Sequence, residues 1–124
     1  MIFSKKQLDV WLLEVGLGGR YDPVNCFDAD ISVITKVAID HEDILGKGVE
    51  NIGREKAGII RKNNVTIFGE GKIPKSVDKI ISNLNGNLFC LIYSRQLWLD
   101  CAIILPDLQH QRKSICWKCT CVCF

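Results

Sequence analysis

The stretch from Val10 to Asn25 constrains the fold of this 124-residue sequence more than any other segment. An apolar run, Val10 to Leu13, leads directly into Glu14 and then into a glycine-rich turn. A continuous apolar run bounded by glycine is typical of a strand buried on both faces of a parallel sheet. Ligands of such sheets bind beyond the carboxyl ends of the strands, where Glu14 would lie. Because an unpaired buried carboxylate is costly, we expect Glu14 to bind a metal or a substrate, or else to pair with Arg20.

A second apolar segment, Ile31 to Ala38, predicts another strand, and it too ends in polar residues. The segment Asp40-His41-Glu42-Asp43 follows it, and Gly46 and Gly48 then interrupt the chain. From about Val49 to Ile60 the spacing of apolar residues predicts a helix. The predicted strand ends therefore carry two groups of polar side chains that a parallel sheet would bring to the same edge.

Lys56 is the unusual residue of this predicted helix. It falls four residues after Ile52 and three before Ile59, on the apolar face that Val49 and Ile60 extend. A lysine in that position either extends its stem along the apolar surface to reach water or has its charge removed chemically. The residues alone leave both possibilities open.

The remaining elements complete an alternation of strands and helices. Strands are predicted at Leu8–Val15, Val65–Phe68 and Leu88–Tyr93, and Pro74–Leu84 reads as an amphipathic helix with proline in its first turn. This order predicts an α/β fold with a parallel sheet. The apolar face of the second helix is expected to be core, and it consists of Val77, Ile80, Ile81 and Leu84.

Composition narrows the class of protein. The sequence is 48% hydrophobic and 24% charged with a net charge of +2, and its basic residues are dispersed, so nothing in it favours nucleic-acid binding. It contains no apolar stretch of transmembrane length and no signal-peptide pattern, which predicts a cytoplasmic protein without a membrane partner. Seven cysteines, an odd number, argue against a disulfide framework. Cys116, Cys119, Cys121 and Cys123 are too tightly spaced for a usual structural zinc site.

Three consecutive blocks of the sequence resemble the folylpolyglutamate synthase/dihydrofolate synthase family of Mur-ligase-like, ATP-dependent amide ligases. The blocks are LLEVGLGGRYDPVN, ISVITKVAIDHEDILG and IGREKAGI, in that order. The resemblance runs from about Leu8 to Gly58 and more loosely to about Arg95. It implies part of the central ATPase domain, a partial P-loop-type parallel-sheet domain, over residues 1–95. Residues 96–124 have no counterpart in the family and are interpreted as a shifted reading frame or a degraded gene end that was never selected for a fold.

The resemblance also implies the chemistry. Members of the family ligate L-glutamate to dihydropteroate or folate by way of an acyl phosphate, with ATP and Mg2+ as cofactors. By position, Glu14 and His41 would be metal ligands, and Lys56 would be the catalytic lysine that is typically carbamylated. Asp22 and Asn25 would lie on the side that binds the pteroate substrate. Arg20 is expected to hold the turn by pairing with a nearby acid.

Two departures from the family pattern limit what the chain is expected to do. The family's Leu-Asp-Ala-Thr-Asn corner reads Tyr21-Asp22-Pro23-Val24-Asn25 here, which makes pterin binding at this corner doubtful. The family's P-loop lies upstream of the Glu14 block, and no G-x-x-x-x-G-K-S/T motif occurs in these residues. We therefore expect an inactive, monomeric fragment. The alternatives are a non-catalytic polypeptide that binds a partner, a remnant, or part of a murein-precursor ligase.

Overall fold

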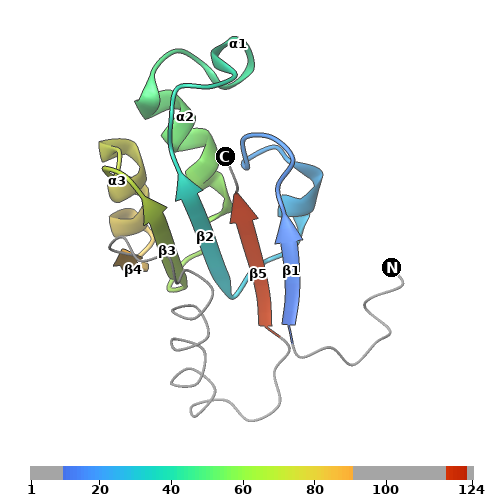
Figure 1. The fold of residues 1–124 in the computed structure, drawn as a ribbon. Helices are drawn as coiled ribbons and strands as arrows, with labels where there is room; N and C mark the ends of the chain where they lie inside the picture. The colour runs from blue at the N-terminus through green and yellow to red at the C-terminus, as the bar shows by residue number, and fades with distance from the viewer. Residues whose placement is uncertain (1–9, 91–116, 123–124) are drawn as a thin grey trace.

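A computed structural model describes residues 10–90 and 117–122 of the chain (Figure 1). Its strands and helices alternate along most of the sequence, as the apolar pattern predicts. In chain order the elements are β1 (Val10–Glu14), η2 (Pro23–Cys26), β2 (Ile31–Lys36), α1 (Glu42–Leu45), α2 (Val49–Lys56), η3 (Ala57–Ile59), β3 (Val65–Glu70), α3 (Lys75–Asn83), β4 (Asn87–Cys90) and β5 (Trp117–Val122), where η denotes a 3-10 helix.

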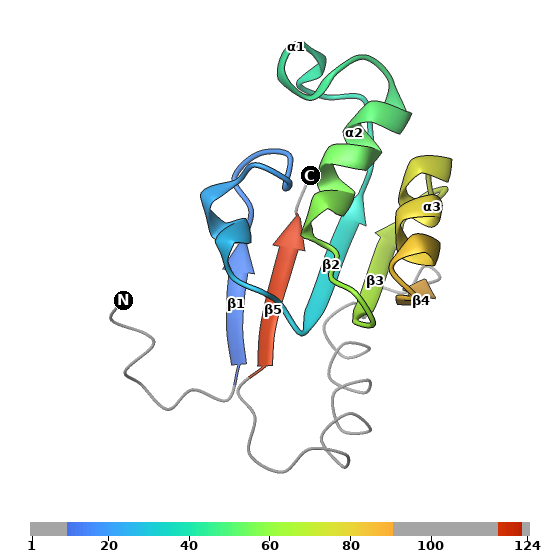
Figure 2. The ribbon, with the colours of Figure 1, turned by 180° about the vertical axis from the view of Figure 1, so that it is seen from behind.

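The strands form one five-stranded sheet in the order β1-β5-β2-β3-β4, and every neighbouring pair is parallel. This confirms the prediction of an α/β fold with a parallel sheet. Helices α2 and α3 lie against the same face of the sheet, and α1 and the turn after β1 lie beyond the carboxyl ends of the strands (Figures 1 and 2). The architecture therefore leaves the carboxyl edge open for a site.

The core lies between the central strands and the two longer helices. Ile34 of β2 and Phe68 of β3 are almost completely buried, and they pack in one cluster with Ile59. The predicted apolar face of α3 is confirmed, because Val77 and Ile81 belong to this cluster while its partly buried members include Ile80 and Leu84.

The hydroxyl of Ser32, completely buried on β2, donates to the carbonyl of Ile59 at 3.0 Å. This bond joins η3 to the central strand. The chain that follows Lys56 is therefore attached to the sheet by a hydrogen bond as well as by apolar packing.

Several helices and strands begin or end at residues other than the sequence predicts. The helix expected to reach Ile60 ends at Lys56 and continues as the short 3-10 turn η3, and the strand expected to reach Ala38 ends at Lys36. His41, which directly precedes helix α1, adopts the left-handed conformation, and apolar periodicity does not reveal this. Strand β4 starts at Asn87, and its predicted end at Tyr93 lies outside the described residues, as does the start of the first strand at Leu8.

Strand β5 is the largest difference from the sequence-based expectation. Its residues, Trp117–Val122, belong to the tail that was expected to take no part in the fold, yet they pair with both β1 and β2. The proposed domain boundary after residue 95 falls among residues 91–116, which are not described. An origin of the tail in a shifted reading frame stays a prediction, which resequencing of the encoding DNA tests.

A carboxylate links the two longer helices. The backbone amides of Lys75 and Ser76, at the start of α3, donate to Glu50 of α2 at 3.1 and 2.7 Å. The bond from the Ser76 amide is the main reason that the pKa of Glu50 lies below its ordinary value. Glu50 thus satisfies amides that α3 cannot bond internally. None of the helices in the described part of the chain is long and apolar enough to cross a bilayer.

Candidate functional site

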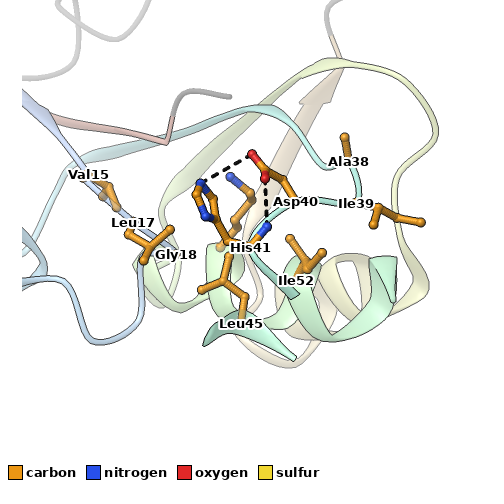
Figure 3. A pocket seen from close by; sticks show the side chains of 11 residues that line it. Val15, Leu17, Gly18, Ala38, Ile39, Asp40, His41, Leu45 and Ile52 are labelled. Atoms are coloured by element: carbon orange, nitrogen blue, oxygen red, sulfur yellow. Dashed lines mark hydrogen bonds and ion pairs between the residues drawn. The ribbon is translucent and has the colours of Figure 1, made fainter. Parts of the chain in front are cut away.

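A small pocket of about 160 Å3 opens at the carboxyl edge of the sheet. Its walls come from three parts of the chain, namely the turn after β1, the segment between β2 and α1, and the inner face of α2 (Figure 3). Of the two polar groups predicted to follow the strands, only the second contributes side chains, Asp40 and His41. The lining residues are Val15, Gly16, Leu17, Gly18, Ala38, Ile39, Asp40, His41, Leu45, Ile52 and Lys56.

Lys56 is the last residue of α2 and lies in the wall of this pocket. Only 6% of the residue is exposed, and Ile52, one turn earlier on the same face, is completely buried. The side chain of Lys56 therefore does not extend into bulk water.

His41 reaches the pocket from the segment that follows β2. It adopts a left-handed conformation with φ of 49°, and its backbone amide donates to Asp40 Oδ1 at 2.8 Å. Its Nε2 lies 3.5 Å from Asp40 Oδ2, and Figure 3 shows the two side chains facing one another. About half of the imidazole is exposed, so the ring remains accessible to a ligand.

Glu14 stands apart from these two residues. It ends β1 and is exposed, and it precedes the pocket wall without being part of it. The described residues contain no group of three or more His, Cys, Asp or Glu side chains placed to hold one metal ion. Magnesium is usually bound by one or two carboxylates together with substrate phosphates and water, not by a complete protein cage. Metal binding by Glu14 and His41 therefore stays a prediction.

A close backbone contact sets the distance between the turn after β1 and the end of α2. The amide of Arg20 donates to the carbonyl of Glu55 at 3.0 Å. A Cβ on Gly19 would lie 3.1 Å from the carbonyl oxygens of Glu55 and Lys56, and a Cβ on Gly58 would lie 2.6 Å from the Cα of Arg20. The two backbones meet because neither glycine has a side chain. The EKAGI block and the GLGGR block therefore contact each other through their backbones.

Asp22 closes the turn after β1. Its carboxylate accepts from the amides of Gly16 at 2.9 Å and Leu17 at 3.4 Å, and its other oxygen accepts from the amide of Val24 at 2.8 Å. Asp22 caps the 3-10 helix that starts at Pro23. A proline there costs no hydrogen bond, because the first residue of a helix has no partner for its amide.

Asn25 is similarly engaged. Its Nδ2 donates to the carbonyls of Arg20 and Gly58, each at 3.1 Å, and its Oδ1 accepts from Arg61 Nη2 at 2.9 Å. Asp22 and Asn25 were predicted to bind substrate. In the structure Asp22 bonds amides within the turn, whereas Asn25 joins the turn to η3. Substrate binding by these two residues stays a prediction.

Arg61 completes this network and was missed by the sequence analysis. Its Nη2 also donates to the carbonyl of Asn25 at 2.8 Å, its Nη1 donates to the carbonyl of Ile59 at 3.1 Å, and its Nε bonds Asp28 at 2.6 Å. No periodicity marks Arg61, whose only signal is its position two residues after the EKAGI block. The expected ion pair of Arg20 is wrong within the described residues, where its guanidinium lies 5.5 Å from the ring centre of Tyr21 instead.

Comparison with known proteins supports the resemblance seen in the sequence blocks. No family model matches the chain. The dihydrofolate synthase/folylpolyglutamate synthase of Escherichia coli is 53% identical over 76 residues, which are 61% of this chain and 18% of that enzyme. The enzyme of the same name from Buchnera aphidicola subsp. Schizaphis graminum is 53% identical over 79 residues, which are 64% of this chain and 19% of that enzyme.

Solved structures give the same result for the fold. E. coli FolC in complex with DHPP and ADP superposes with a TM-score of 0.61 at 46% identity, over 63% of this chain and 19% of that one. The bifunctional folylpolyglutamate synthase/dihydrofolate synthase from Yersinia pestis, complexed with AMPPNP and Mn ion, superposes with a TM-score of 0.66 at 44% identity, over 72% of this chain and 22% of that one. Over its matched segment the chain is therefore similar to dihydrofolate synthase/folylpolyglutamate synthases, and it spans about a fifth of the length of these relatives.

Proposed function

We propose that this chain is a fragment of the central ATPase domain of a cytoplasmic dihydrofolate synthase/folylpolyglutamate synthase. The observation that carries the proposal is the identity of 53% with two enzymes of that name, over 79 and 76 residues. The parent reaction would join L-glutamate to dihydropteroate or folate. ATP would first phosphorylate the acceptor carboxylate, and the glutamate amine would then displace phosphate from the acyl phosphate.

Within that reaction the residues of this chain would serve the nucleotide and metal side. Glu14 and His41 would contribute ligands to a magnesium ion that the phosphates also hold. When bound, Mg2+ neutralises the charge that develops on the transferred phosphoryl group. The close contact of Gly19 with the end of α2 would keep these ligands at a fixed distance from Lys56.

Lys56 would act as a carbamate. Its neutral amine nitrogen attacks the carbon of carbon dioxide, a nitrogen–carbon bond forms, and one proton leaves to solvent. The amine would thereby become an anion that supports a neighbouring metal ion. The place of Lys56 supports this assignment, because it is buried in the wall of the same pocket that His41 lines.

Asp22 and Asn25 would act indirectly, without contacting the substrate. Asp22 holds the turn after β1 together and Asn25 joins that turn to η3, so they would shape the substrate side without contacting the pterin. The isolated chain is expected to be inactive as a monomer. Phosphoryl transfer depends on positioned phosphate-binding groups, and no P-loop motif occurs among these 124 residues.

Two experiments test the proposal. Addition of carbon-13 bicarbonate should give a carbamate signal in the NMR spectrum of the purified chain, and Lys56→Ala should abolish it. Binding of Mn2+ with ADP, followed by electron paramagnetic resonance, should weaken in Glu14→Gln and in His41→Ala. The matched control Glu70→Gln, at the end of β3, should bind as the natural chain does.

The proposal is wrong if the Glu14 and His41 variants bind Mn2+ and ADP as well as the control does. Turnover of ATP, folate and glutamate by the natural chain above that of Lys56→Ala would refute the expected inactivity. The carbamate is refuted separately if the carbon-13 signal survives the loss of Lys56.

A further inference from the structure

A groove of about 490 Å3 lies between helices α2 and α3, apart from the pocket at the carboxyl edge of the sheet. The two helices lie side by side (Figure 2), and no described residue lines both the groove and the pocket. Ligand pockets in proteins typically have volumes of about 300–1,000 Å3. The groove is therefore large enough for a ligand of its own, and the proposed reaction assigns nothing to it.

Three cationic side chains line this groove. Arg54 comes from α2, Lys79 from α3 and Arg20 from the turn after β1, and all three residues are exposed. Within the described part of the chain, none of the three belongs to an ion pair, and none of the residues lining the groove is acidic. A cleft lined by charges of one sign concentrates their field, so this groove attracts anions.

The carboxylate of Glu50 on α2 is engaged elsewhere. It accepts the backbone amides of Lys75 and Ser76 at the start of α3, and Glu50 is not among the lining residues. The three cations therefore have no fixed acidic partner among the residues that the structure describes, and a ligand can supply one.

The groove is elongated because one of its walls follows α3. The residues of this wall have the spacing i, i+3, i+4, i+7 and i+8, which is typical of one helix face: Ser76, Lys79, Ile80, Asn83 and Leu84. At a rise of 1.5 Å per residue this face is about 12 Å long. An extended peptide covers about 3.3 Å per residue, so roughly four residues of peptide match that length.

The floor of the groove is apolar. Ala57 and Ile60, from the chain after α2, are almost completely buried, and the partly buried Ile80 and Leu84 line the groove from α3. Such a groove suits a ligand that places apolar side chains on the floor and carboxylates near the three exposed cations. Successive side chains of an extended peptide point to opposite sides, so a peptide in which acidic and apolar residues alternate makes both contacts.

We propose that this groove binds an extended acidic segment of a partner polypeptide, about four residues long, in which Asp or Glu alternates with apolar residues. Arg20 and Arg54 bind carboxylates of the segment through the planar fork of the guanidinium, and Lys79 adds a third cation. The site is distinct from the pocket that His41 and Lys56 line, and it does not depend on the proposed reaction. It makes the outer side of α2 and α3 an interaction surface.

Fluorescence anisotropy with the full 124-residue chain tests the proposal. The probe is a fluorescein-labelled hexapeptide of alternating Glu and Leu, and the control peptide has Gln in place of each Glu. The acidic probe should bind about tenfold tighter than the control peptide, because it adds three exposed ion pairs. Its binding should weaken as NaCl is raised from about 50 to 500 mM, since salt screens exposed charges.

Variants of the groove locate the bound peptide. Arg54→Gln and Lys79→Gln should each weaken binding of the probe up to about fivefold, and the double variant should weaken it about tenfold. Lys47→Gln is the matched control, because Lys47 is exposed before α2 and does not line the groove, yet its loss changes the net charge equally. This control should leave the affinity within about twofold. Circular dichroism checks that each variant folds, and the comparison of the two peptides on the natural chain needs no variant.

Three outcomes overturn the proposal. The acidic and control peptides bind equally, or Lys47→Gln weakens binding as much as the groove variants do, in which case net charge alone explains the attraction. In the third outcome, inorganic phosphate at the concentration of the probe displaces it, which shows a site for any small anion. Loss of Mn2+ and ADP binding concerns the proposed function only, because the groove shares no described lining residue with that pocket.

Discussion

Replacing Arg61 with alanine tests whether the turn after β1 and the end of α2 are held as one unit. The guanidinium donates to Asn25 Oδ1 at 2.9 Å, to the Asn25 carbonyl at 2.8 Å and to the Ile59 carbonyl at 3.1 Å. Its bond to Asp28 is short, but that carboxylate is 89% exposed, so we assign little stability to it. Arg61 itself is only 23% exposed, which leaves the other bonds mostly shielded from water.

The expected loss follows from these bonds. A hydrogen bond to a charged group contributes about 1.5–3 kcal/mol, and the partial exposure of Arg61 favours the lower end of that range. Counting the two shortest shielded bonds, Arg61→Ala should lower the free energy of unfolding by about 3 kcal/mol. Arg61→Lys should restore only part of the loss, because an ammonium group cannot reproduce the planar fork.

Urea unfolding followed by circular dichroism measures this change, and Arg54→Ala provides a matched control. Arg54 is exposed on α2 and makes one long bond of 3.4 Å to Asn51, so its loss should stay within about 0.5 kcal/mol. A double-mutant cycle of Asn25→Ala with Arg61→Ala should show coupling of about 1 kcal/mol or more. Additive effects, or an Arg61→Ala cost equal to that of the control, would refute the argument that these residues act as one clamp.

Three further changes test the packing and the helix contact. Gly58→Ala should destabilise the chain by about 1–3 kcal/mol in urea unfolding, because its Cβ would lie 2.6 Å from the Cα of Arg20, and a neutral effect would contradict that contact. Phe68→Ala should cost about 3–5 kcal/mol in the same assay, whereas Phe89→Ala on β4, 43% exposed, should cost much less. For Glu50, whose pKa is lowered, the contribution to stability is present above its ordinary value of 4.5 and is lost as pH falls through the lowered value. The stability difference between the natural chain and Glu50→Gln should therefore shrink as the pH of the thermal unfolding assay is lowered from 7 toward 3, and a constant difference would rule out this linkage.

The sequence predicts those helices and strands whose spacing of apolar residues matches the faces that are buried. Apolar runs indicate β2 and β3 because both strands are buried in the sheet, and the period of 3.6 residues indicates α3 because one of its faces packs on the core. The position of Lys56 on an apolar face is another local property, and the structure bears out its burial. Each of these features depends on residues within a few positions of one another.

Contacts between residues far apart in the sequence could not be predicted in this way. Strand β5 pairs with β1 across more than a hundred positions of sequence, and no pattern in residues 117–122 indicates which strands they pair with. The roles of Asn25 and Arg61 depend on a contact across 36 positions, which a polar pattern alone does not encode. The sequence therefore did not reveal that the Asn25 side chain holds the backbone, and its contact with substrate stays a prediction.

The hydrogen bonds of Asn25 and Arg61 define one side of the candidate site. The turn after β1 and the end of α2 form this side, and they are also held by the backbone contact at Gly19, all within a continuous part of the sequence. Because Lys56 lies at this contact, loss of these hydrogen bonds should disturb the surroundings of Lys56 as well as the stability of the chain.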